Sequence, residues 1–271
     1  MPPLIAKTAI GHPFLELPEV ESTNIYAMEQ LQANLAAHGT AFFAHSQTAG
    51  KGQHGKSWTT EPGTHLAMSV VLDSSFLSVS QQFPLSVMAA LATHDLFSKY
   101  AGKETRIKWP NDIYWRDRKA GGILIENQLK GNIWQGSVVG VGINLNQVHF
   151  PLSLPNPVSL KQITGKSFHT VTAAKELCEC LETHYQELKN GGFKNQFARY
   201  NKHLYKLGEE VKLKKGNIVF NCFIRGVSEE GELLVSGGLQ DSFKFGEVEW
   251  VRKNEQMNIE QGTDEQKTRK R

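Results

Sequence analysis

The spacing of apolar and polar positions in the first half of the chain predicts helices and strands in alternation. Residues 23–37 and 84–99 repeat apolar side chains at helical spacing. Ser22 or Thr23 is placed to cap the first segment, and Pro84 lies near the first turn of the second. Short apolar runs predict strands over 41–46, 66–72, 106–109, 112–115, 121–127 and 132–145, and the last two form an antiparallel pair.

The pattern changes further along the chain. Residues 149–170 are rich in Pro and Ser and predict a loop or a short turn of helix, whereas 172–189 and 193–201 predict two helices. After Leu207, short strands follow each other closely with turn residues between them. We therefore expect a large domain over 1–205, a small barrel over 206–252 and a disordered, polar tail over 253–271.

Composition narrows the classes of function. The chain has 271 residues, 39% of them hydrophobic, and a formal net charge of +3, which is too mild for a nucleic-acid binder. It contains no apolar run near the roughly 18 residues that cross a bilayer, and its N-terminus does not resemble a signal peptide. The odd cysteine count of three argues against a disulfide framework. We expect a cytoplasmic protein that binds neither DNA nor membrane.

Gly50, Gly52 and Gly55 spell G-x-G-x-x-G after a predicted strand, which is the outline of a dinucleotide fingerprint. That fingerprint needs a helix that begins at the glycines, because the pyrophosphate lies on its N-terminus. The residues that follow, KSWTTEPGTH, contain Pro62 and Gly63 and have no helical period. We therefore predict a loop here and not a dinucleotide site.

The loop over 49–57 carries lysines and glycines and ends beside Trp58. Backbone N–H groups at glycines can surround an anion, and the lysines add positive charge. A plain solvated surface loop is the alternative. Because a glycine-rich segment loses much entropy when it becomes ordered, we expect this loop to be mobile and to close only over a ligand.

Five motifs occur in order along the first domain. They are E-S-T-N (21–24), Q-T-A-G-K-G-Q-H-G-K-S-W (47–58), K-W-P-N-D (108–112), K-A-G-G-I-L-I-E (119–126) and V-G-V-G-I-N (139–144). In this order and spacing they resemble the motifs of biotin–protein ligases. The resemblance implies an α/β (α+β) fold, with a mixed sheet backed by helices as in class II synthetase-like domains, followed by a small SH3-like barrel.

The resemblance also implies an activity. Biotin would be adenylated with ATP and Mg²⁺ to biotinyl-5′-AMP, because a free carboxylate is a poor electrophile. Biotin would then pass to a lysine of a biotin carboxyl carrier protein, or of the carrier domain of acetyl-CoA carboxylase or a related carboxylase. An exposed strand edge could pair with this acceptor or with a second copy of the chain, so a homodimer stays open.

The resemblance assigns roles to individual residues. Residues implied to bind biotin are Ser22, Thr23, Asn24, Gln47, Lys51, Gly52, Gln53, Lys119, Gly121 and Gly122. Residues implied to bind ATP are Lys51, Trp58, Lys108, Asn111, Lys119 and Asn144. Lys119, Lys108 and Asp112 are implied to be catalytic, and Asp112 also serves Mg²⁺.

Each assignment has a structural alternative. Ser22 and Thr23 could cap a helix, Lys119 could be a surface lysine, and Asn111 and Asn144 could be turn residues. Trp58 and Trp109 could pack in the core, which is the role we expect for Trp109.

Two departures from the family pattern are informative. Gln53 stands where the family often has arginine, which removes a forked cation. About 18 residues precede the first motif, too few for a helix-turn-helix, so we expect the short form without a DNA-binding domain. A lipoate–protein ligase-like acyl transferase is the alternative enzyme, and a biotin sensor that regulates DNA is the non-enzymatic alternative.

Overall fold

The computed structural model describes residues 8–59, 61–79, 81–131, 133–154 and 156–251. The chain forms two compact units, one ending at Tyr205 and the other beginning at Lys206. The tail over 253–271, which the sequence predicts to be disordered, lies outside the described residues. None of the helices in the described ranges combines the length and apolar character that a membrane-spanning helix needs.

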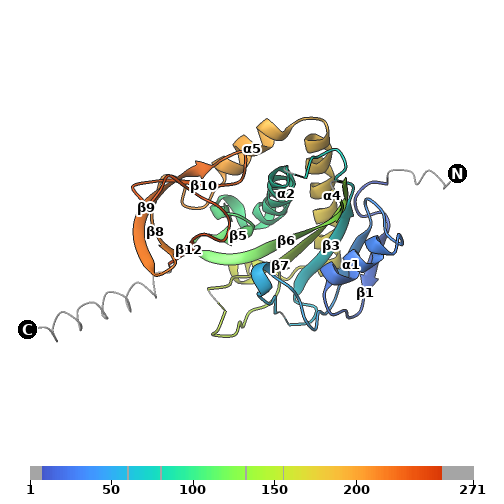
Figure 1. Cartoon of the computed structure of the whole chain (residues 1–271). Coiled ribbons are helices and arrows are strands. Elements are labelled where there is room, and N and C mark those ends of the chain that lie inside the picture. Colours follow the sequence, from blue (N-terminus) through green and yellow to red (C-terminus); the bar gives the residue numbers. More distant parts are fainter. Residues whose placement is uncertain (1–7, 60, 80, 132, 155, 252–271) are drawn as a thin grey trace, which may run out of the picture. The chain divides into compact units, whose positions relative to one another are not determined.

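A seven-stranded sheet forms the centre of the first unit (Figure 1). Its strands are β1 (Phe14–Leu17), β2 (Ala41–Ala44), β3 (His65–Leu72), β4 (Thr105–Lys108), β5 (Asp112–Trp115), β6 (Arg118–Lys130) and β7 (Ile133–Asn144). They lie in the order β1-β2-β3-β7-β6-β5-β4. The pair β1–β2 is parallel and the other neighbours are antiparallel, which confirms the expected mixed sheet.

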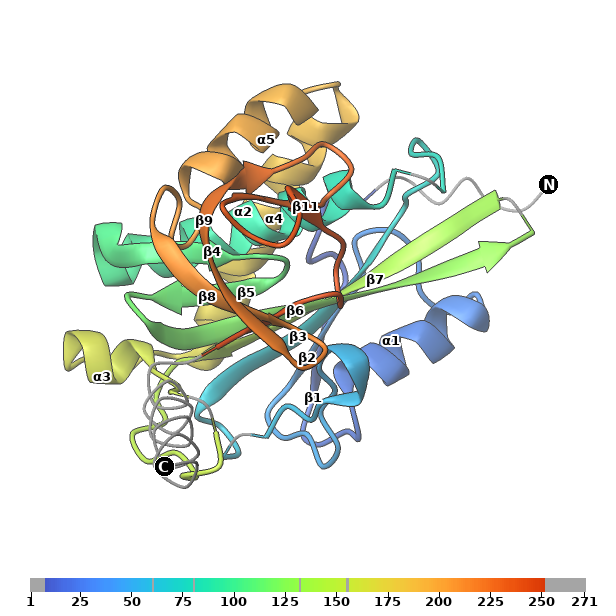
Figure 2. The ribbon, with the colours of Figure 1, turned by 60° about the vertical axis from the view of Figure 1, so that its left-hand side comes forward.

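Helices cover both faces of this sheet (Figure 2). The helices are α1 (Thr23–Gln32), α2 (Phe83–Ala101), α3 (Leu160–Thr164), α4 (Thr170–Lys189) and α5 (Phe193–Lys202). In β3, Ser69 bonds to Thr23 of α1, whereas the neighbouring Met68 contacts Cys178 of α4. Successive strand residues point to opposite faces. The helix α1 therefore covers one face, α4 covers the other, and β3 is buried along its whole length.

The structure shifts several predicted boundaries. The first helix ends at Gln32 and not at residue 37, because the chain turns at Asn34, whose φ is +58°. The strand β1 and the one-turn 3₁₀ segments η1 (Gln53–Gly55) and η2 (Gly102–Glu104) are additions that the sequence did not predict. The helix α3 lies in the stretch predicted as a loop or short helical turn, and Ser159 caps it through a capping box.

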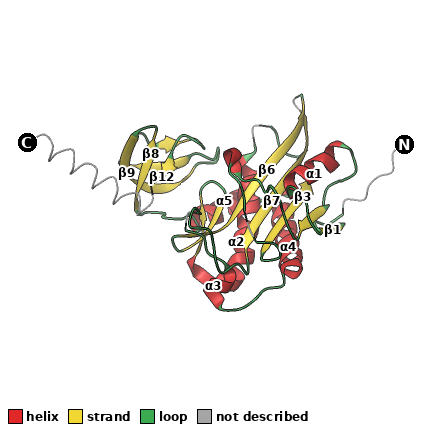
Figure 3. Cartoon of the chain, turned by 90° about the horizontal axis from the view of Figure 1, so that it is seen from below, coloured by secondary structure: helices red, strands yellow, loops and turns green. Residues whose placement is uncertain are grey.

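The second unit consists of strands and loops (Figure 3). Its strands are β8 (Glu210–Lys215), β9 (Ile218–Val227), β10 (Leu233–Ser236), β11 (Ser242–Phe243) and β12 (Glu249–Trp250). They form one antiparallel sheet in the order β11-β10-β9-β8-β12. Buried side chains from four of these strands (Leu213, Cys222, Ile224, Leu233 and Phe243) form its core, as expected of a small SH3-like barrel.

Candidate functional site

A pocket on the α1 face of the large sheet collects residues from all five sequence motifs. It has about 480 Å³ of empty space. Its lining comes from the start of α1, the glycine loop, and strands β3, β5, β6 and β7. Of the residues that the resemblance assigned, those that line it are Ser22, Thr23, Asn24, Gln47, Lys51, Gly52, Gln53, Trp58, Asn111, Asp112, Lys119 and Gly122. Segments about 120 residues apart in sequence thus form one site.

The start of α1 contributes a buried polar network. Thr23 donates its backbone N–H and its hydroxyl to Oε1 of Gln47, at 2.8 and 3.2 Å. Ser69 Oγ lies 2.8 Å from the Thr23 hydroxyl and 2.6 Å from Oδ1 of Asn24. Ser22 occupies the N-cap position, but its side chain makes no capping hydrogen bond to the described residues. The two hydroxyl side chains and the Gln47 amide therefore belong to the pocket and do not serve as a helix cap.

Asn24 is held on several sides. Its amide nitrogen donates to Glu126 Oε2 at 2.9 Å and to the Leu124 carbonyl at 3.3 Å. A Cβ at Gly140 would collide with Oδ1 of Asn24, so the glycine is required for this packing. The sequence reasoning missed Ser69 and Glu126. A serine inside the apolar strand HLAMSVVL was the available signal for Ser69.

An ion pair lies on the β5–β6 side of the pocket. Lys119 Nζ is 2.6 Å from Asp112 Oδ1, and both side chains are mostly shielded from solvent. A Cβ at Gly122 would lie 3.4 Å from that oxygen and 3.5 Å from Lys119 Nζ, so the glycine keeps space open beside the pair. Gly121 has a different role, because a Cβ there would lie 2.7 Å from the Gly142 carbonyl oxygen of β7. Gly121 allows close packing between strands.

Lys108 lies on β4 and does not line the pocket itself. It pairs in register with Asp112 across the β4–β5 hairpin, which places the two residues on the same sheet face. Its ammonium donates to the Tyr114 hydroxyl at 3.1 Å and lies 4.5 Å from the centre of the Tyr114 ring and 5.7 Å from that of Tyr205. Two aromatic rings thus hold this lysine. Trp109 is buried, as expected.

The glycine loop forms a small hairpin. Lys51 bridges to Ser57, the Gly52 N–H donates to the Lys56 carbonyl at 2.6 Å, and Trp58 N–H donates to the Gly50 carbonyl at 2.7 Å. The segment Gln53–Gly55 is a single 3₁₀ turn, so the helix that a dinucleotide fingerprint needs does not follow the glycines. The predicted loop is therefore confirmed at this position.

The Trp58 ring lies on the floor of the pocket. A Cβ at Gly142 would be 2.6 Å from its Cε2 atom, so the indole packs directly on the backbone of β7. Lys119 Nζ lies 5.8 Å from the ring centre. The indole Nε1 is buried and has no hydrogen-bond partner among the described residues. Trp58 therefore both packs against the sheet and lines the ligand pocket.

The two asparagines assigned to ATP differ in position. Asn111 lines the pocket and donates to the Ile123 carbonyl at 2.7 Å. Asn144 is buried at the end of β7, outside the lining, and donates to the Val158 carbonyl at 3.2 Å. The structure thus brings Asn111 to the site and gives Asn144 a supporting contact to the segment after β7.

Comparisons with known proteins agree with this arrangement. Residues 17–144 match the model of the biotin/lipoate A/B protein ligase family. The bifunctional ligase/repressor BirA of Bacillus subtilis is 29% identical over 84% of this chain and 71% of its own length. The biotin–[acetyl-CoA-carboxylase] ligase of Paracoccus denitrificans is 28% identical over 82% of this chain and 93% of its own length.

A solved structure extends the likeness to three dimensions. The biotin protein ligase from Aquifex aeolicus in complex with biotin and ATP has a TM-score of 0.73 and 27% identity, and the match covers 88% of this chain and 98% of that one. Fold and pocket define the class of α/β protein ligases with a small C-terminal barrel. Residues 17–144 form a domain of the biotin/lipoate A/B protein ligase family, which confirms the resemblance inferred from the five motifs.

Proposed function

We propose that the chain is a biotin–protein ligase. It adenylates biotin with ATP to biotinyl-5′-AMP and then transfers the biotinyl group to a lysine of a biotin carboxyl carrier protein or domain. The observation that carries this function is one pocket in which a neutral polar network at one end faces a lysine–aspartate pair at the other. A ligand with a polar, uncharged head and a reactive carboxylate fits those two ends.

The ureido head of biotin is assigned to the α1 end of the pocket. A ureido group both donates and accepts hydrogen bonds, and so do the side chains of Ser22, Thr23 and Gln47. The network through Ser69 holds Thr23 in place. Asn24 supports this end from behind, because Glu126 and Ser69 already engage its amide.

Lys119 is assigned to the biotin carboxylate and the α-phosphate. Negative charge develops at these groups in both half-reactions, and a preorganised ammonium stabilises it. Asp112 holds the ammonium at 2.6 Å from its own oxygen. The incoming anion partly replaces Asp112 as the partner of this ammonium. Gly122, which has no side chain, leaves space for the anion. Gly121 supports the position of this strand against β7.

The nucleotide is assigned to the neighbouring groups. Trp58 offers a ring for adenine, Asn111 an amide at the rim, and Lys51 a mobile cation from the loop. Asn144 supports the same region through Val158. Lys108, on the same sheet face as Asp112, is assigned to the outer phosphates. Loop residues Gly52 and Gln53 close over the bound biotin.

Mg²⁺ fits the donors that the site offers. Magnesium binds through one or two carboxylates, with phosphate oxygens and waters as its other ligands. Asp112 is the one carboxylate among the lining residues that the structure describes. It would hold the ion together with the phosphates of ATP, and the ion would offset charge on the departing pyrophosphate.

The acceptor protein is assigned to the open edge of β6. The strand β5 pairs with β6 only up to Gly122, and beyond it β6 pairs with β7 alone among the described strands. Unpaired strand edges bind extended segments. A second copy of the chain could use the same edge, so the homodimer remains the competing occupant. We assign the activity to the cytoplasm and assign no role in DNA binding.

One experiment tests the function directly. The purified chain is incubated with biotin, ATP, Mg²⁺ and the carrier domain of a carboxylase, and the domain is weighed by mass spectrometry. The expected result is one added biotinyl group, lost when ATP is omitted or when the carrier's acceptor lysine is replaced. Lipoate in place of biotin should give no product. Labelling with lipoate but not with biotin would contradict the proposal.

A further inference from the structure

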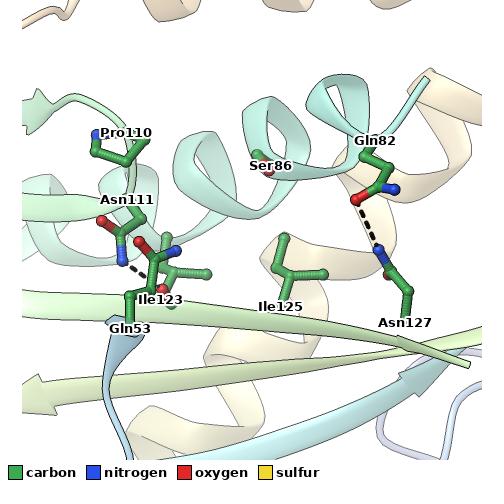
Figure 4. Close-up of a pocket in the computed structure, with 8 residues that line it drawn as sticks. All are labelled: Gln53, Gln82, Ser86, Pro110, Asn111, Ile123, Ile125 and Asn127. Carbon is green, nitrogen blue, oxygen red and sulfur yellow. Dashed lines mark hydrogen bonds between the residues drawn. The ribbon is translucent and has the colours of Figure 1, made fainter. Parts of the chain in front are cut away.

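A second hollow lies beside the ligand pocket, between the first turns of α2 and the strand β6 (Figure 4). It has about 440 Å³ of empty space, part of which is open to solvent. Ile123 and Ile125 of β6 form its floor. Gln53 and Asn111 lie at one end, Gln82 and Asn127 at the other, and Ser86 of α2 lies between them.

This hollow and the ligand pocket meet at one end. Gln53, Asn111 and Ile123 line both of them. Gln82, Ser86, Ile125 and Asn127 line the second hollow but not the ligand pocket. The hollow therefore lies on the α2 side of β6 and adjoins the ligand pocket of the α1 face at Gln53, Asn111 and Ile123.

Its chemistry differs from that of the ligand pocket. All eight lining residues are uncharged, and four of them carry carboxamides. Three of those amides are engaged, because Asn127 donates to Gln82 at 3.1 Å and Asn111 donates to the Ile123 carbonyl at 2.7 Å. By contrast, Oε1 of Gln53 is buried and has no hydrogen-bond partner among the described residues.

An unpartnered buried acceptor is costly unless a ligand supplies a donor. The ligand that fits here has an aliphatic stem for the two isoleucines and an N–H group at its tip for Gln53. It reaches the ligand pocket at the Gln53–Asn111 end. A lysine side chain in its neutral amine form meets all of these conditions.

We propose that this hollow is the channel through which the acceptor lysine reaches biotinyl-adenylate, a step that rests on the proposed function. The methylene groups lie along Ile125 and Ile123, and Gln53 accepts a hydrogen bond from the amine. The ammonium first loses a proton to solvent. The amine nitrogen then bonds to the anhydride carbonyl carbon, the carbon–oxygen bond to phosphate breaks, and AMP leaves with the electron pair. The nitrogen gives its second proton to water.

The uncharged lining helps to prepare the nucleophile. Only the neutral amine carries a free electron pair, and burial without a carboxylate disfavours the ammonium form. The positive end of the α2 dipole, at Gln82 and the residues after it, acts in the same direction. The channel therefore favours deprotonation where the amine enters the site.

The first test fills the channel without touching the ligand pocket. Biotinyl-adenylate is formed on the enzyme and mixed with carrier domain, and single-turnover transfer is followed. Ser86→Phe should slow transfer by about tenfold or more at saturating carrier, because the amine is displaced from its line of attack. Adenylate formation should be unchanged, and so should the reaction of the bound adenylate with hydroxylamine, a nucleophile small enough to need no channel. Ser86→Ala is the matched control and should behave as the wild type.

The second test compares two substitutions at Ser86 that are similar in shape but differ in charge. Ser86→Asp places a carboxylate in the channel and raises the pKa of the incoming amine, so transfer at pH 7 should fall roughly tenfold for each unit of that shift. The rate should recover as the pH rises, and Ser86→Asn should show no such pH dependence. If Ser86 served only in packing, Ser86→Asp and Ser86→Asn would show the same transfer rate and the same pH dependence.

The outcomes are distinguishable. Unchanged transfer in Ser86→Phe overturns the channel, and so does a defect that appears only in KM for the carrier, because that result would describe a docking surface. A loss of hydroxylamine reactivity would mean that the variant damages the ligand pocket, and it also counts against the proposal. Failure of the wild-type chain to form biotinyl-adenylate would instead contradict the proposed function.

Discussion

Lys51 and Lys119 line the same pocket but are supported in opposite ways. Lys119 belongs to a strand with neighbours on both sides, and Asp112 holds its ammonium. Lys51 is exposed on a loop whose backbone hydrogen bonds lie mostly within the loop, through Gly50, Gly52 and Lys56. One side of the site is therefore a rigid wall, formed by β4, β5 and β6 with Lys108, Asp112 and Lys119. The other side is the glycine loop, which becomes ordered mainly through contacts with the ligand.

This difference suggests that the two sides of the site have different roles. A group that stabilises charge in the transition state must be preorganised, because reorganisation adds to the barrier. A group that retains a reactive intermediate must open and close, because the ligand has to enter and leave. We therefore expect the rigid wall to govern the rate of adenylation and the loop to govern the lifetime of the bound intermediate.

The largest effect is expected at the rigid wall. Lys119→Ala should lower biotin-dependent ATP–pyrophosphate exchange by about a hundredfold or more, because one preorganised charge contact is lost. The thermal unfolding midpoint should change little, since the lysine side chain is partly exposed. Lys166→Ala, at an exposed lysine outside the pocket, is the control and should exchange normally. Normal exchange in Lys119→Ala would remove this residue from the chemistry.

The loop should affect retention of the intermediate and not the rate of adenylation. Lys51→Ala and Gly52→Ala should speed the release of preformed biotinyl-adenylate, and Gln53→Arg should slow it, each by several-fold, since an exposed charged contact contributes roughly 1 kcal/mol. The off-rate is measured without acceptor. Hydrogen exchange over 49–57 should slow when ligand binds. Equal off-rates in all three variants, or equal exchange with and without ligand, would contradict the closing loop.

The comparison also explains which parts of the site the sequence revealed. The rigid wall and the loop were both found because their residues stand in contiguous motifs, such as K-A-G-G-I and G-K-G-Q. Each motif carries its own local signal, in glycines where backbone approaches closely and in cations beside them. Strand positions followed from apolar runs because the sheet is buried on both faces at β3.

The residues that support the site escaped sequence reasoning for a physical reason. Glu126 contacts Asn24 across 102 positions, and Ser69 contacts Thr23 across 46. Tyr205 reaches Lys108 from the end of the first unit. Contacts of this kind depend on which strands become neighbours, and no local spacing encodes them. The early end of α1 was missed because the apolar pattern continues past Gln32 to Leu35 and Ala36, of which Ala36 is buried without being helical.

A smaller effect should come from the aromatic support of the rigid wall. Tyr114→Phe keeps the ring over Lys108 but removes the hydroxyl that accepts from its ammonium at 3.1 Å. A lost hydrogen bond to a charged group corresponds to about 1 kcal/mol or somewhat more, so KM for ATP should rise roughly fivefold. Biotin affinity, measured by calorimetry without ATP, should be unchanged. Tyr26→Phe is the matched control. Equal KM values for ATP in the two variants would show that Lys108 does not contact the nucleotide.

The smallest effect concerns the stability of the wall in acid. The His203 carbonyl accepts from the Ile107 N–H of β4, and Ile107 in turn accepts from Tyr205, so the end of α5 is joined to the strand that carries Lys108. Burial lowers the pKa of His203 to about 4, and His94, Arg106 and Lys202 act in the same direction while Asp95 opposes them. The His94 ring lies 4.2 Å from the His203 ring.

The folded state therefore disfavours the His203 imidazolium, whereas the unfolded chain takes up this proton near its ordinary pKa of 6.5. Between pH 6.5 and about 4 the unfolded state binds more protons, so the free energy of unfolding should fall with falling pH in this window and His203 should add nothing further below it. His203→Gln should make the decline shallower, and His149→Gln, at an exposed histidine, should leave it unchanged. The measurement is urea unfolding at half-unit pH steps. Parallel curves for wild type and His203→Gln across the window would show that protonation of this histidine does not lower the free energy of unfolding in acid.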